Sequence, residues 1–534
     1  MKKLVALLLS LFMLVSLGTA LAEEQVSKTL TVLHPKSPLV EDYDTNAFIL
    51  WLEETTGIDV NWMQIPASSF ADKVNAIIMS GDLPDVINWP HMPRTIQQQW
   101  ADEGIIIALD NLIDEYGVHT KRLFEEQPGT DDFIRLADGK IYAMPTYSDI
   151  IHVNYTNRFF INTEFLAALG METPTTLDEF YKYLVGVRDQ DVNGNGDPSD
   201  EIPMAAMANW GTDQFTFIMN CFLFYDFKNP IDIDENGVIH SVLDNDAFRE
   251  GLTFMNKLYE EGLLYENVNL DSKGVVALGE SGDGYAIVGC HPGTLASGGV
   301  EGGEIYHQYE AISPLEGPSG LRQTPWYRYV NIREGAWMIT SACDDVQTAF
   351  ELGDFLYSYD STMRLRHGEF GTSWVLPNEG ELTIDGRQAT FKELIAYSSD
   401  VQNLHLDNDL MFYETRGVFL DDGVFGAIST DLKDAINRQW LMSENTKKYM
   451  VPYGREVVPT VTIPSDMLDE YSTITTDMNT YYKEWMAHFL IGEADIKDDA
   501  TWEEYVQGLK DLGIERYLEI YNKAYEASPL KWGN

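Results

Sequence analysis

Short apolar runs alternate with longer helical patterns in the first part of the chain, and this alternation limits the fold more than any other feature. Apolar or alternating runs predict three strands, and apolar residues at helical spacing predict two helices between them. The strands are expected at Leu30–Leu33, Ile58–Trp62 and Asp85–Asn88, and the helices at Phe48–Thr56 and Phe70–Met79. A β-α-β-α-β order predicts a parallel sheet covered by helices.

The carboxyl ends of these strands are the expected place for a ligand, because open α/β sheets bind their ligands there. Lys36 lies shortly after the first strand, and Asn88 and Trp89 lie at the end of the third. We therefore expect these three side chains to lie beside a cleft.

The length and charge of the chain limit its organisation and its partners. At 534 residues it exceeds the usual single core, so two or more lobes are expected. No internal repeat and no long linker rich in proline or serine occurs, so strands that cross between the lobes should join them.

Asp and Glu number 85 against 36 Lys and Arg, a formal net charge of −49. This charge argues against nucleic acid or an anionic membrane surface as a partner, because both require basic patches.

The first 22 residues have the pattern of a secretory signal peptide. Lys2 and Lys3 precede an apolar run, Leu4–Leu17, and Ala20–Ala22 fits a cleavage site with small residues. The run is too short to span a membrane, and the residue after the cleavage site is Glu23 rather than a lipid-carrying cysteine. We therefore expect an extracytoplasmic protein, periplasmic or secreted, with no membrane span after cleavage.

Cysteine is rare in this chain and occurs only at Cys221, Cys290 and Cys343. An odd and sparse set is not a disulfide framework, although one pair stays open. We expect buried free thiols.

A run of oxygen-bearing side chains around two glycines, Asp189–Glu201, has the spacing of a calcium-binding loop. Ca²⁺ takes about six to eight oxygen ligands, and only a sharply folded backbone brings close neighbours onto one point. A second register that begins at Asp189 places Pro198 where an acidic residue should close the site. The alternative is a solvated acidic turn, since Asn, Gly and Asp are common turn residues. The expected ligands of one structural Ca²⁺ are the side chains of Asp191, Asn193, Asn195, Asp200 and Glu201 and the backbone carbonyl of Asp197.

No catalytic motif stands out in the sequence. His-Glu-x-x-His, Gly-x-Ser-x-Gly and the lysine-containing phosphate loop do not occur, and the ten histidines are scattered. A carboxylate pair for glycoside hydrolysis stays open, but among 85 acidic residues some pair arises by chance. A secreted polysaccharide-processing enzyme is therefore kept as the alternative to a binding protein that performs no chemistry.

Several motifs resemble, in the right order, the extracellular solute-binding proteins that serve carbohydrate ABC transporters. Ser80–Val86 resembles the Gly-Asp-x-Pro-Asp signature of that family, and Asp138–Pro145 resembles the strand that first crosses toward the second lobe. Leu169-Gly170 and Pro174–Phe180 are similar to the family's helix-entry segment, which the calcium-like run follows. The loop itself resembles the Asp-x-Asn-x-Asn-x-x-x-Asp-Glu pattern of the large subgroup that includes the alginate-binding proteins, with one residue more before Asp200. Later landmarks are Pro314–Gly320, Ala336–Thr340 and the C-terminal run Phe489–Glu493.

The resemblance implies an α/β fold of two lobes, the type II periplasmic-binding-protein-like fold, with the ligand cleft between the lobes. It places a first lobe at residues 23–147, with returning segments at approximately 336–420. A second lobe that carries the calcium loop is expected at residues 148–335. A helical C-terminal region, residues 421–534, is expected to pack across the lobes.

The same resemblance implies the function of a monomeric substrate-binding protein. Such a protein captures an oligosaccharide outside the cytoplasm and delivers it to the permease subunits of an ABC transporter. Structural Ca²⁺ is the only cofactor that the resemblance implies.

Aromatic and polar residues near the predicted crossings are the candidates for ligand contact. Sugars lay their C–H faces on aromatic rings while polar side chains bond the hydroxyls. Trp62 and Trp337 lie within strand-like runs and are interpreted as packing residues, and a surface loop position is the alternative for His291. The aromatic candidates are Trp89, Tyr147, Trp210, Trp326 and Trp374, of which Trp326 and Trp374 lead, and the polar candidates are Lys36, Asn88, Asn154, Asp213 and His291.

Overall fold

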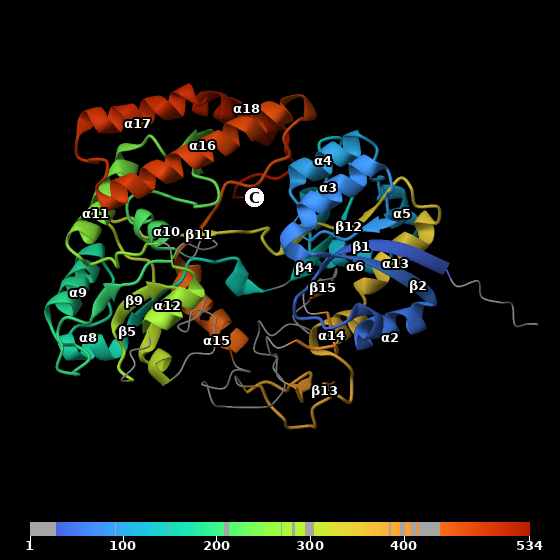
Figure 1. Cartoon of the computed structure of the whole chain (residues 1–534), viewed down its shortest axis with the longest axis horizontal. Coiled ribbons are helices and arrows are strands. Elements are labelled where there is room, and N and C mark those ends of the chain that lie inside the picture. The colour runs from blue at the N-terminus through green and yellow to red at the C-terminus, as the bar shows by residue number, and fades with distance from the viewer. Residues whose placement is uncertain are drawn as a thin grey trace, which may run out of the picture.

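The structure consists of two lobes, each with its own β-sheet and flanking helices (Figure 1). It is a computed structural model that describes residues 28–90, 92–148, 150–207, 213–268, 270–279, 284–293, 304–383, 386–395, 401–406, 413–414 and 438–533. The first lobe lies on the right of Figure 1 and the second on the left. The predicted signal peptide lies outside the described residues.

The first lobe is built on a six-stranded sheet with the strand order β15-β4-β12-β3-β1-β2. β1 pairs in parallel with both β2 and β3, which confirms the parallel arrangement predicted from the alternation. β12 runs antiparallel to β3 and β4, because it enters the sheet from the second lobe. The strands are β1 (Lys28–Lys36), β2 (Ile58–Pro66), β3 (Val86–Ile87), β4 (Met144–Ser148), β12 (Ile332–Ile339) and β15 (Tyr413–Glu414).

Both faces of this sheet are buried. Leu30 and Val32 of β1 belong to one apolar cluster and Leu33 to another, as expected when successive side chains point to opposite faces. Trp337 and Trp62 are both buried, which confirms their interpretation as packing residues. The helices of this lobe are α2 (Ala47–Thr56), α3 (Phe70–Ser80), α4 (Arg94–Asp102), α5 (Asp110–Tyr116), α6 (His119–Glu126), α7 (Thr130–Ile134), α13 (Val346–Leu356) and α14 (Tyr359–His367), and a small hairpin joins β13 (Trp374–Val375) to β14 (Lys392–Glu393).

The second lobe is built on a four-stranded sheet with the order β10-β5-β9-β6. β5 is buried along its whole length, and Phe159 on this strand stacks on Phe217 with 4.3 Å between the ring centroids. The strands are β5 (Phe159–Asn162), β6 (Ile202–Met204), β9 (Val288–Pro292) and β10 (Tyr309–Ile312), and β7 (Ile231–Ile233) and β8 (Ile239–Ser241) form a separate hairpin that packs against the C-terminal region. The helices are α8 (Thr163–Leu169), α9 (Leu177–Asp189), α10 (Gln214–Met219), α11 (Asp246–Glu260) and α12 (Ser272–Gly279).

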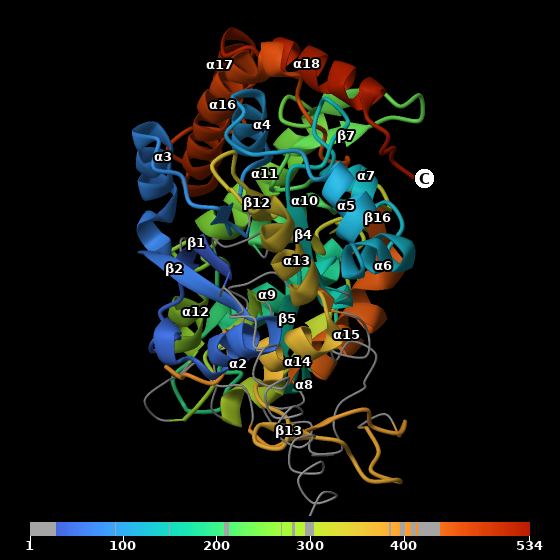
Figure 2. The ribbon, with the colours of Figure 1, turned by 90° about the vertical axis from the view of Figure 1, so that its right-hand side faces the viewer.

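The C-terminal region is helical, and its long helices lie along one end of the molecule (Figure 2) and pack mainly on the second lobe (Figure 1). Tyr482 and Tyr505 share an apolar cluster with Phe248 of α11. The region also contacts the first lobe, where the Ser465 hydroxyl donates to Asp102 Oδ2 at 2.6 Å. Its elements are α15 (Arg438–Asn445), β16 (Gly454–Glu456), α16 (Ser465–Ile491), α17 (Asp499–Asp511) and α18 (Ile514–Ala527). The domain boundaries drawn from the sequence stay a prediction, and residues 421–437 lie outside the described part.

Two further properties of the described chain bear on the sequence analysis. Cys221, Cys290 and Cys343 are all free and buried, which confirms the expected free thiols. Among the helices of the described ranges, none combines the length and the apolar character that crossing a membrane requires.

Candidate ligand-binding cleft

Two described segments cross between the lobes, and a third lies beside them. The first leads from β4 to β5, and the second leads from β11 (Thr324–Trp326) to β12. The third contains β16 and residues 457–463. Because β11 pairs in parallel with β16, the second and third segments run side by side at the base of the space between the lobes.

Asn154 fastens the first crossing to the second. Its side-chain Nδ2 donates to the backbone O of Tyr327 at 2.6 Å, and Tyr327 N donates back to Asn154 O at 2.9 Å. Asn331 Nδ2 donates to Asn154 Oδ1 at 3.1 Å. The structure therefore uses this predicted ligand residue to hold the two crossings together, and its contact with a ligand stays a prediction.

The third segment is held to the second by backbone and charged contacts. Val457 N donates to Trp326 O at 3.0 Å, and Arg328 Nε lies 2.9 Å from Glu456 Oε1. Burial raises the pKa of Glu456, while an amide hydrogen bond and Arg328 act against that rise. Together with the Asn154 contacts, these contacts join the three segments, which are far apart in the sequence, at the base of the cleft.

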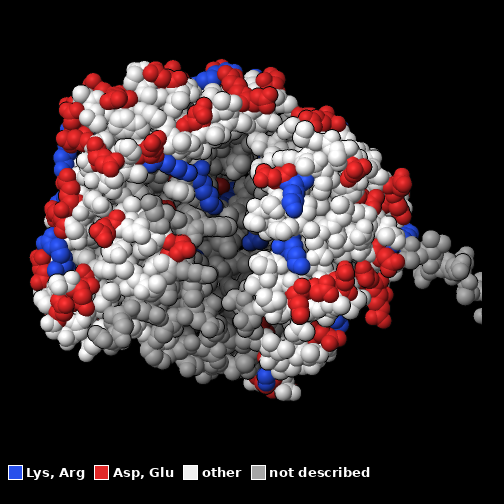
Figure 3. Space-filling model, viewed as in Figure 1, with Lys and Arg blue, Asp and Glu red and all other residues white. Residues whose placement is uncertain are grey.

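A cavity of about 1000 Å³ lies on these segments, between the lobes. Met92 follows β3 and Met207 follows β6, so strand ends of both lobes reach it, as expected for an α/β ligand site. Figure 3 shows a groove between the lobes with Lys and Arg atoms on both of its sides. The described lining comprises Met92, Pro93, Phe133, Ser148, Ile150, His152, Val153, Thr156, Arg158, Met207, Lys228, Tyr327–Glu334, Met442, Glu456, Val457, Pro459 and Thr460.

An aromatic pair lies in the wall of this cavity. The ring of Tyr329, which is half-buried, stacks on Phe133 with 5.0 Å between centroids and 20° between planes. Tyr329 comes from the second crossing and Phe133 from α7 of the first lobe. Apolar ring atoms therefore lie beside backbone and side-chain polar groups, a composition typical of sites for small polar ligands.

A cation and a carboxylate of the second lobe meet Tyr327 at the edge of the cavity. Lys228 Nζ lies 4.1 Å from the centroid of the Tyr327 ring, and the Tyr327 hydroxyl donates to Asp226 Oδ1 at 2.6 Å. Burial lowers the pKa of Lys228, and the charge of Asp226 acts against this. Burial raises the pKa of Asp226.

Arg158 brings a further positive charge to the cavity. Its side chain is buried, and its Nη1 donates to the backbone oxygens of His152 and Tyr155, each at 2.9 Å, and to Thr446 Oγ1 at 3.2 Å. Burial lowers the pKa of Arg158 to about 10, so the group stays charged near neutral pH. The guanidinium thus fixes the first crossing against the C-terminal region.

Arg94 and Glu334 form an ion pair at the edge of the first lobe. Arg94 Nε lies 2.5 Å from Glu334 Oε2, and both side chains are largely buried. Arg94 Nη1 also donates to Thr462 Oγ1 at 2.7 Å, Nη2 donates to Phe133 O, and the guanidinium lies 5.0 Å from the Phe133 ring centroid. Burial raises the pKa of Glu334, and Arg94 acts against this rise. The pair therefore ties α4 and β12 to the third segment.

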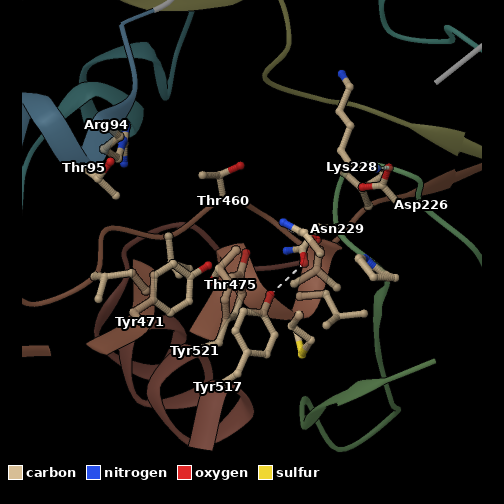
Figure 4. Close-up of a pocket in the computed structure, with 18 of the residues that line it drawn as sticks. Arg94, Thr95, Asp226, Lys228, Asn229, Thr460, Tyr471, Thr475, Tyr517 and Tyr521 are labelled. Atoms are coloured by element: carbon tan, nitrogen blue, oxygen red, sulfur yellow. Dashed lines mark hydrogen bonds between the residues drawn. The ribbon is translucent and has the colours of Figure 1, made fainter. Parts of the chain in front are cut away.

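A second cavity, of about 360 Å³, lies between α4 and the C-terminal helices (Figure 4). Besides Tyr327, three tyrosines of the C-terminal helices, Tyr471, Tyr517 and Tyr521, line it, and the Tyr517 hydroxyl donates to Asn229 Oδ1 at 2.7 Å. Lys228 contributes to both cavities, and Figure 4 shows its side chain extending away from these tyrosines. The larger cavity is the candidate ligand site, because strand ends of both lobes meet there.

The structure places the N-terminal candidates at the strand ends but within local packing. Lys36 is half-buried at the end of β1. Asn88 Nδ2 donates to His34 Nδ1 at 2.9 Å, and burial lowers the pKa of His34 to about 3. Trp89 lies between the rings of Phe70 and Trp100. The Asn88 amide therefore keeps a neutral His34 in one orientation.

The other candidates occupy several separate environments. The Tyr147 hydroxyl donates to Gln127 Oε1 at 2.6 Å. Asp213 caps α10 by accepting from Thr216 N at 2.7 Å, and burial raises its pKa to about 6. His291 is 1% exposed within β9, so the alternative of a surface loop histidine is wrong.

The two leading tryptophans differ in exposure. Trp326 is half-buried, with the Arg328 guanidinium 5.2 Å from its ring centroid. Trp374 is buried, packs with Met363 and Phe391, and donates from Nε1 to Gly368 O at 3.1 Å. Trp210 lies outside the described residues. None of the nine described candidates belongs to the described lining of the cavity, and their ligand contacts stay a prediction.

Sequence reasoning missed the residues that do line the cavity, including Lys228, Arg158, Tyr329 and Glu334. One signal was available, because Trp326–Tyr329 reads Trp-Tyr-Arg-Tyr between two predicted crossings. A dense aromatic run beside a crossing favours its tyrosines, and not only its first tryptophan, as candidate cleft residues.

The acidic loop after α9 folds sharply around its glycines. Gly194 and Gly196 have φ angles of 72° and 93°, a conformation that glycine adopts readily. Their amides donate to the two carboxylate oxygens of Asp191 at 2.8 and 3.0 Å. On the other side, Asn195 Nδ2 donates to Asp200 Oδ2 at 2.7 Å. The predicted ligands from Asp191 to Asp200 are therefore gathered in one loop.

The loop fits a cation in one further respect. Glu201 Oε1 accepts from Val192 N at 2.9 Å, while Oε2 is buried and has no hydrogen-bond partner in the described structure. Burial raises the pKa of Glu201. Arg188 binds both carboxylate oxygens of Asp189, so the register that begins at Asp191 is favoured. Within the described ranges, no three His, Cys, Asp or Glu side chains gather closely enough to hold a metal ion.

Two α/β lobes joined by crossing segments, with a cavity shared between them, define a two-lobe binding protein. A family model described as bacterial extracellular solute-binding protein matches residues 36–363. The chain therefore belongs to the family of bacterial extracellular solute-binding proteins, which confirms the family predicted from its motifs.

Individual relatives agree with this assignment. The fructooligosaccharide ABC transporter substrate-binding protein FusA of Streptococcus pneumoniae serotype 4 is 27% identical over 521 residues, 95% of this chain and 91% of FusA. A solved structure of FusA in complex with kestose has a TM-score of 0.75 at 26% identity, and the match covers 94% of this chain and 99% of that chain.

Other solved structures share the fold. A FusA EF-hand mutant in complex with fructo-nystose has a TM-score of 0.76 at 24% identity, covering 94% of this chain and 99% of that chain. The alginate-binding protein AlgQ2 without calcium ion has a TM-score of 0.68 at 21% identity, covering 94% and 98% of the two chains. These likenesses confirm the predicted two-lobe fold.

Proposed function

We propose that this protein captures an oligosaccharide in the cleft between its lobes, outside the cytoplasm, and delivers it to the permease of an ABC transporter. The main observation in support of this proposal is the cavity of about 1000 Å³, whose lining comes from strand ends of both lobes and from the crossing segments. FusA, named as a fructooligosaccharide ABC transporter substrate-binding protein, supports the ligand class and the transporter.

Binding in this cavity couples to lobe closure. A ligand that touches both walls favours the closed form only through its higher affinity for that form. Phe133 from the first lobe and Lys228 from the second supply groups on opposite sides. The third segment and the Asn154 contacts keep the base of the cleft fixed while the walls approach.

Replacing Tyr329 with alanine should weaken oligosaccharide binding by about 1 to 3 kcal/mol, the range for an apolar side chain that a ligand no longer covers. Isothermal titration calorimetry against a panel of oligosaccharides, including fructooligosaccharides, measures this change. Tyr329→Phe keeps the ring and should bind nearly as well as wild type. Equal affinity of wild type and Tyr329→Ala would remove Tyr329 from the site.

The same samples test the other sequence-based proposals. Trp326→Ala and Trp374→Ala examine the two tryptophans expected as stacking platforms. Incubation with the bound saccharide and an assay for new reducing ends separates a binding protein from a polysaccharide-processing enzyme, since only the enzyme releases them. Failure of the wild type to bind any saccharide would contradict the proposed function.

We also propose that the loop Asp191–Glu201 binds one structural Ca²⁺. The alternating oxygens, the two glycine turns and the buried Glu201 oxygen support it. When bound, the ion would supply the positive charge that lets these carboxylates lie close together. The loop directly follows α9, whose side chains are part of the second-lobe core, so the ion would stabilise that lobe.

A further inference from the structure

The charge of the cleft is opposite to that of the chain as a whole. Acidic residues outnumber basic ones by 85 to 36 in the sequence. The described lining of the large cavity instead holds four Lys and Arg side chains and two Glu side chains. In Figure 3, Lys and Arg atoms lie along the groove, while Asp and Glu atoms are scattered over the outer surface of both lobes. The basic members are Arg158, Lys228, Arg328 and Arg333, and the acidic ones are Glu334 and Glu456.

Both carboxylates in this lining are already engaged by arginine. Glu334 pairs with Arg94 at 2.5 Å, and Glu456 pairs with Arg328 at 2.9 Å. Burial also raises the pKa of each glutamate. Neither carboxylate is therefore directed at Lys228.

Lys228 is the basic group most clearly presented to the cavity. Its side chain is exposed to solvent, yet the protein around it lowers its pKa, a combination expected for an ammonium group in a concave surface. Its Nζ contacts the Tyr327 ring at 4.1 Å and has no hydrogen bond or ion pair in the described part of the chain. The adjacent Asp226 accepts from the Tyr327 hydroxyl and from the backbone N of Lys228.

A partly desolvated ammonium group is unfavourable unless a counter-ion balances it, and the charge of Asp226, which Tyr327 and the Lys228 amide already engage, offsets the lowered pKa of Lys228 only in part. An oligosaccharide that carries a carboxylate would supply that counter-ion through a charge-assisted hydrogen bond, which is stronger than a bond to a neutral hydroxyl. A neutral oligosaccharide would instead displace water from Lys228 and offer only a neutral hydroxyl group in its place.

We propose that the ligand is an acidic oligosaccharide containing uronic acid units, and that Lys228 binds one of its carboxylates. This rests on the proposed function, because it names the chemical class of the saccharide in the same cleft. The negative charge of the remaining surface does not oppose such a ligand within the cavity, since charges more than about 10 Å away are largely screened at physiological salt.

The test compares each acidic saccharide with its own neutral form. Oligosaccharide pools released from pectin, alginate and glucuronoxylan are prepared as such and after reduction of their carboxyl groups to primary alcohols. Native mass spectrometry identifies the bound species, and calorimetry measures their affinity for wild type, Lys228→Gln and Lys182→Gln. Lys182 is the matched control because it is an exposed lysine of the second lobe whose Nζ lies 2.5 Å from Asp178.

The expected result has three parts. Wild type binds an acidic species about tenfold or more tightly than its reduced form, the loss that one hydrogen bond to a charged group accounts for. Lys228→Gln removes most of that preference while still binding the reduced form, and Lys182→Gln leaves it unchanged. The preference should also shrink as salt concentration rises.

Three outcomes overturn the inference without touching the proposed function. In the first, neutral or reduced oligosaccharides bind as tightly as the acidic forms, and in the second, Lys228→Gln keeps the full acidic preference. Binding of a sulfated oligosaccharide in place of every uronate would also contradict it. If no saccharide of either kind binds, the proposed function itself fails, so the two failures are distinguishable.

Discussion

Replacing Arg94 with alanine is expected to lower the free energy of unfolding by about 3 to 5 kcal/mol, the cost of leaving a buried charge without its partner. Arg94 and Glu334 have side chains only 11% and 14% exposed, so water replaces the lost arginine at the carboxylate only in part. The variant also loses the hydrogen bond to Thr462 and the contact with the Phe133 ring. Urea unfolding of wild type and variant measures the difference.

Two control variants separate charge from size. Arg516→Ala removes an arginine from a more exposed pair, whose guanidinium lies 2.8 Å from Glu470, and should cost no more than about 1 kcal/mol. The double variant Arg94→Met with Glu334→Gln removes both charges and should recover much of the loss. A single variant no less stable than Arg516→Ala would show that the pair contributes little.

The pH dependence of the Arg94→Ala effect has a defined sign. Burial raises the pKa of Glu334 and Arg94 acts against that rise, so the pKa rises further in the variant. Once protonated, Glu334 leaves no unpaired charge. The difference in stability between wild type and variant should therefore be largest near pH 7 and narrow as the pH falls through that pKa.

The first lobe was predictable because its signals are local. β1, β2 and β3 are marked by short apolar runs, and the intervening α2 and α3 by helical spacing, so each element needs only neighbouring residues to be identified. The antiparallel insertion of β12 was not indicated by this pattern. It depends on a chain that leaves for the second lobe after β4 and returns nearly two hundred residues later.

The cleft residues were not predictable because their environment is made by distant segments. Asn154 meets Tyr327 across 173 positions of sequence, and no local pattern encodes that contact. Trp374 was expected in a loop as an exposed platform, but it lies in β13, where Met363 and Phe391 cover it. Lys228 lies in a loop with no recognisable motif, and only the folded chain places it beside Tyr327.

The predicted calcium loop is intermediate between these two cases. Its ligand types and spacing are local, and the structure folds Asp191 around two glycine amides as such a loop requires. The number of oxygens that would reach one ion depends on how Asp200 and Glu201 close the loop, which spacing alone does not determine. The loop therefore offers a test of the metal that is independent of the ligand cleft.

Removing calcium is expected to lower the stability of the second lobe by about 2.7 kcal/mol when the ion had been present at a hundredfold excess over its dissociation constant. The reason is that Glu201 Oε2 is buried without a hydrogen-bond donor in the described structure and would regain an uncompensated charge. Thermal unfolding followed by circular dichroism, with calcium and with a chelator, measures the shift. Asp191→Ala should unfold at the same temperature under both conditions.

A second acidic turn supplies the matched control for this prediction. Asp234 Oδ1 accepts the amides of Asn236 and Val238 in a turn that also contains a glycine of positive φ, but no closing pair of carboxylates follows it. Asp234→Ala should therefore keep the full response to calcium while Asp191→Ala loses it. If the wild-type unfolding curve is identical with calcium and with chelator, Asp191–Glu201 is a solvated acidic turn, and its glycines serve only to reverse the chain after α9.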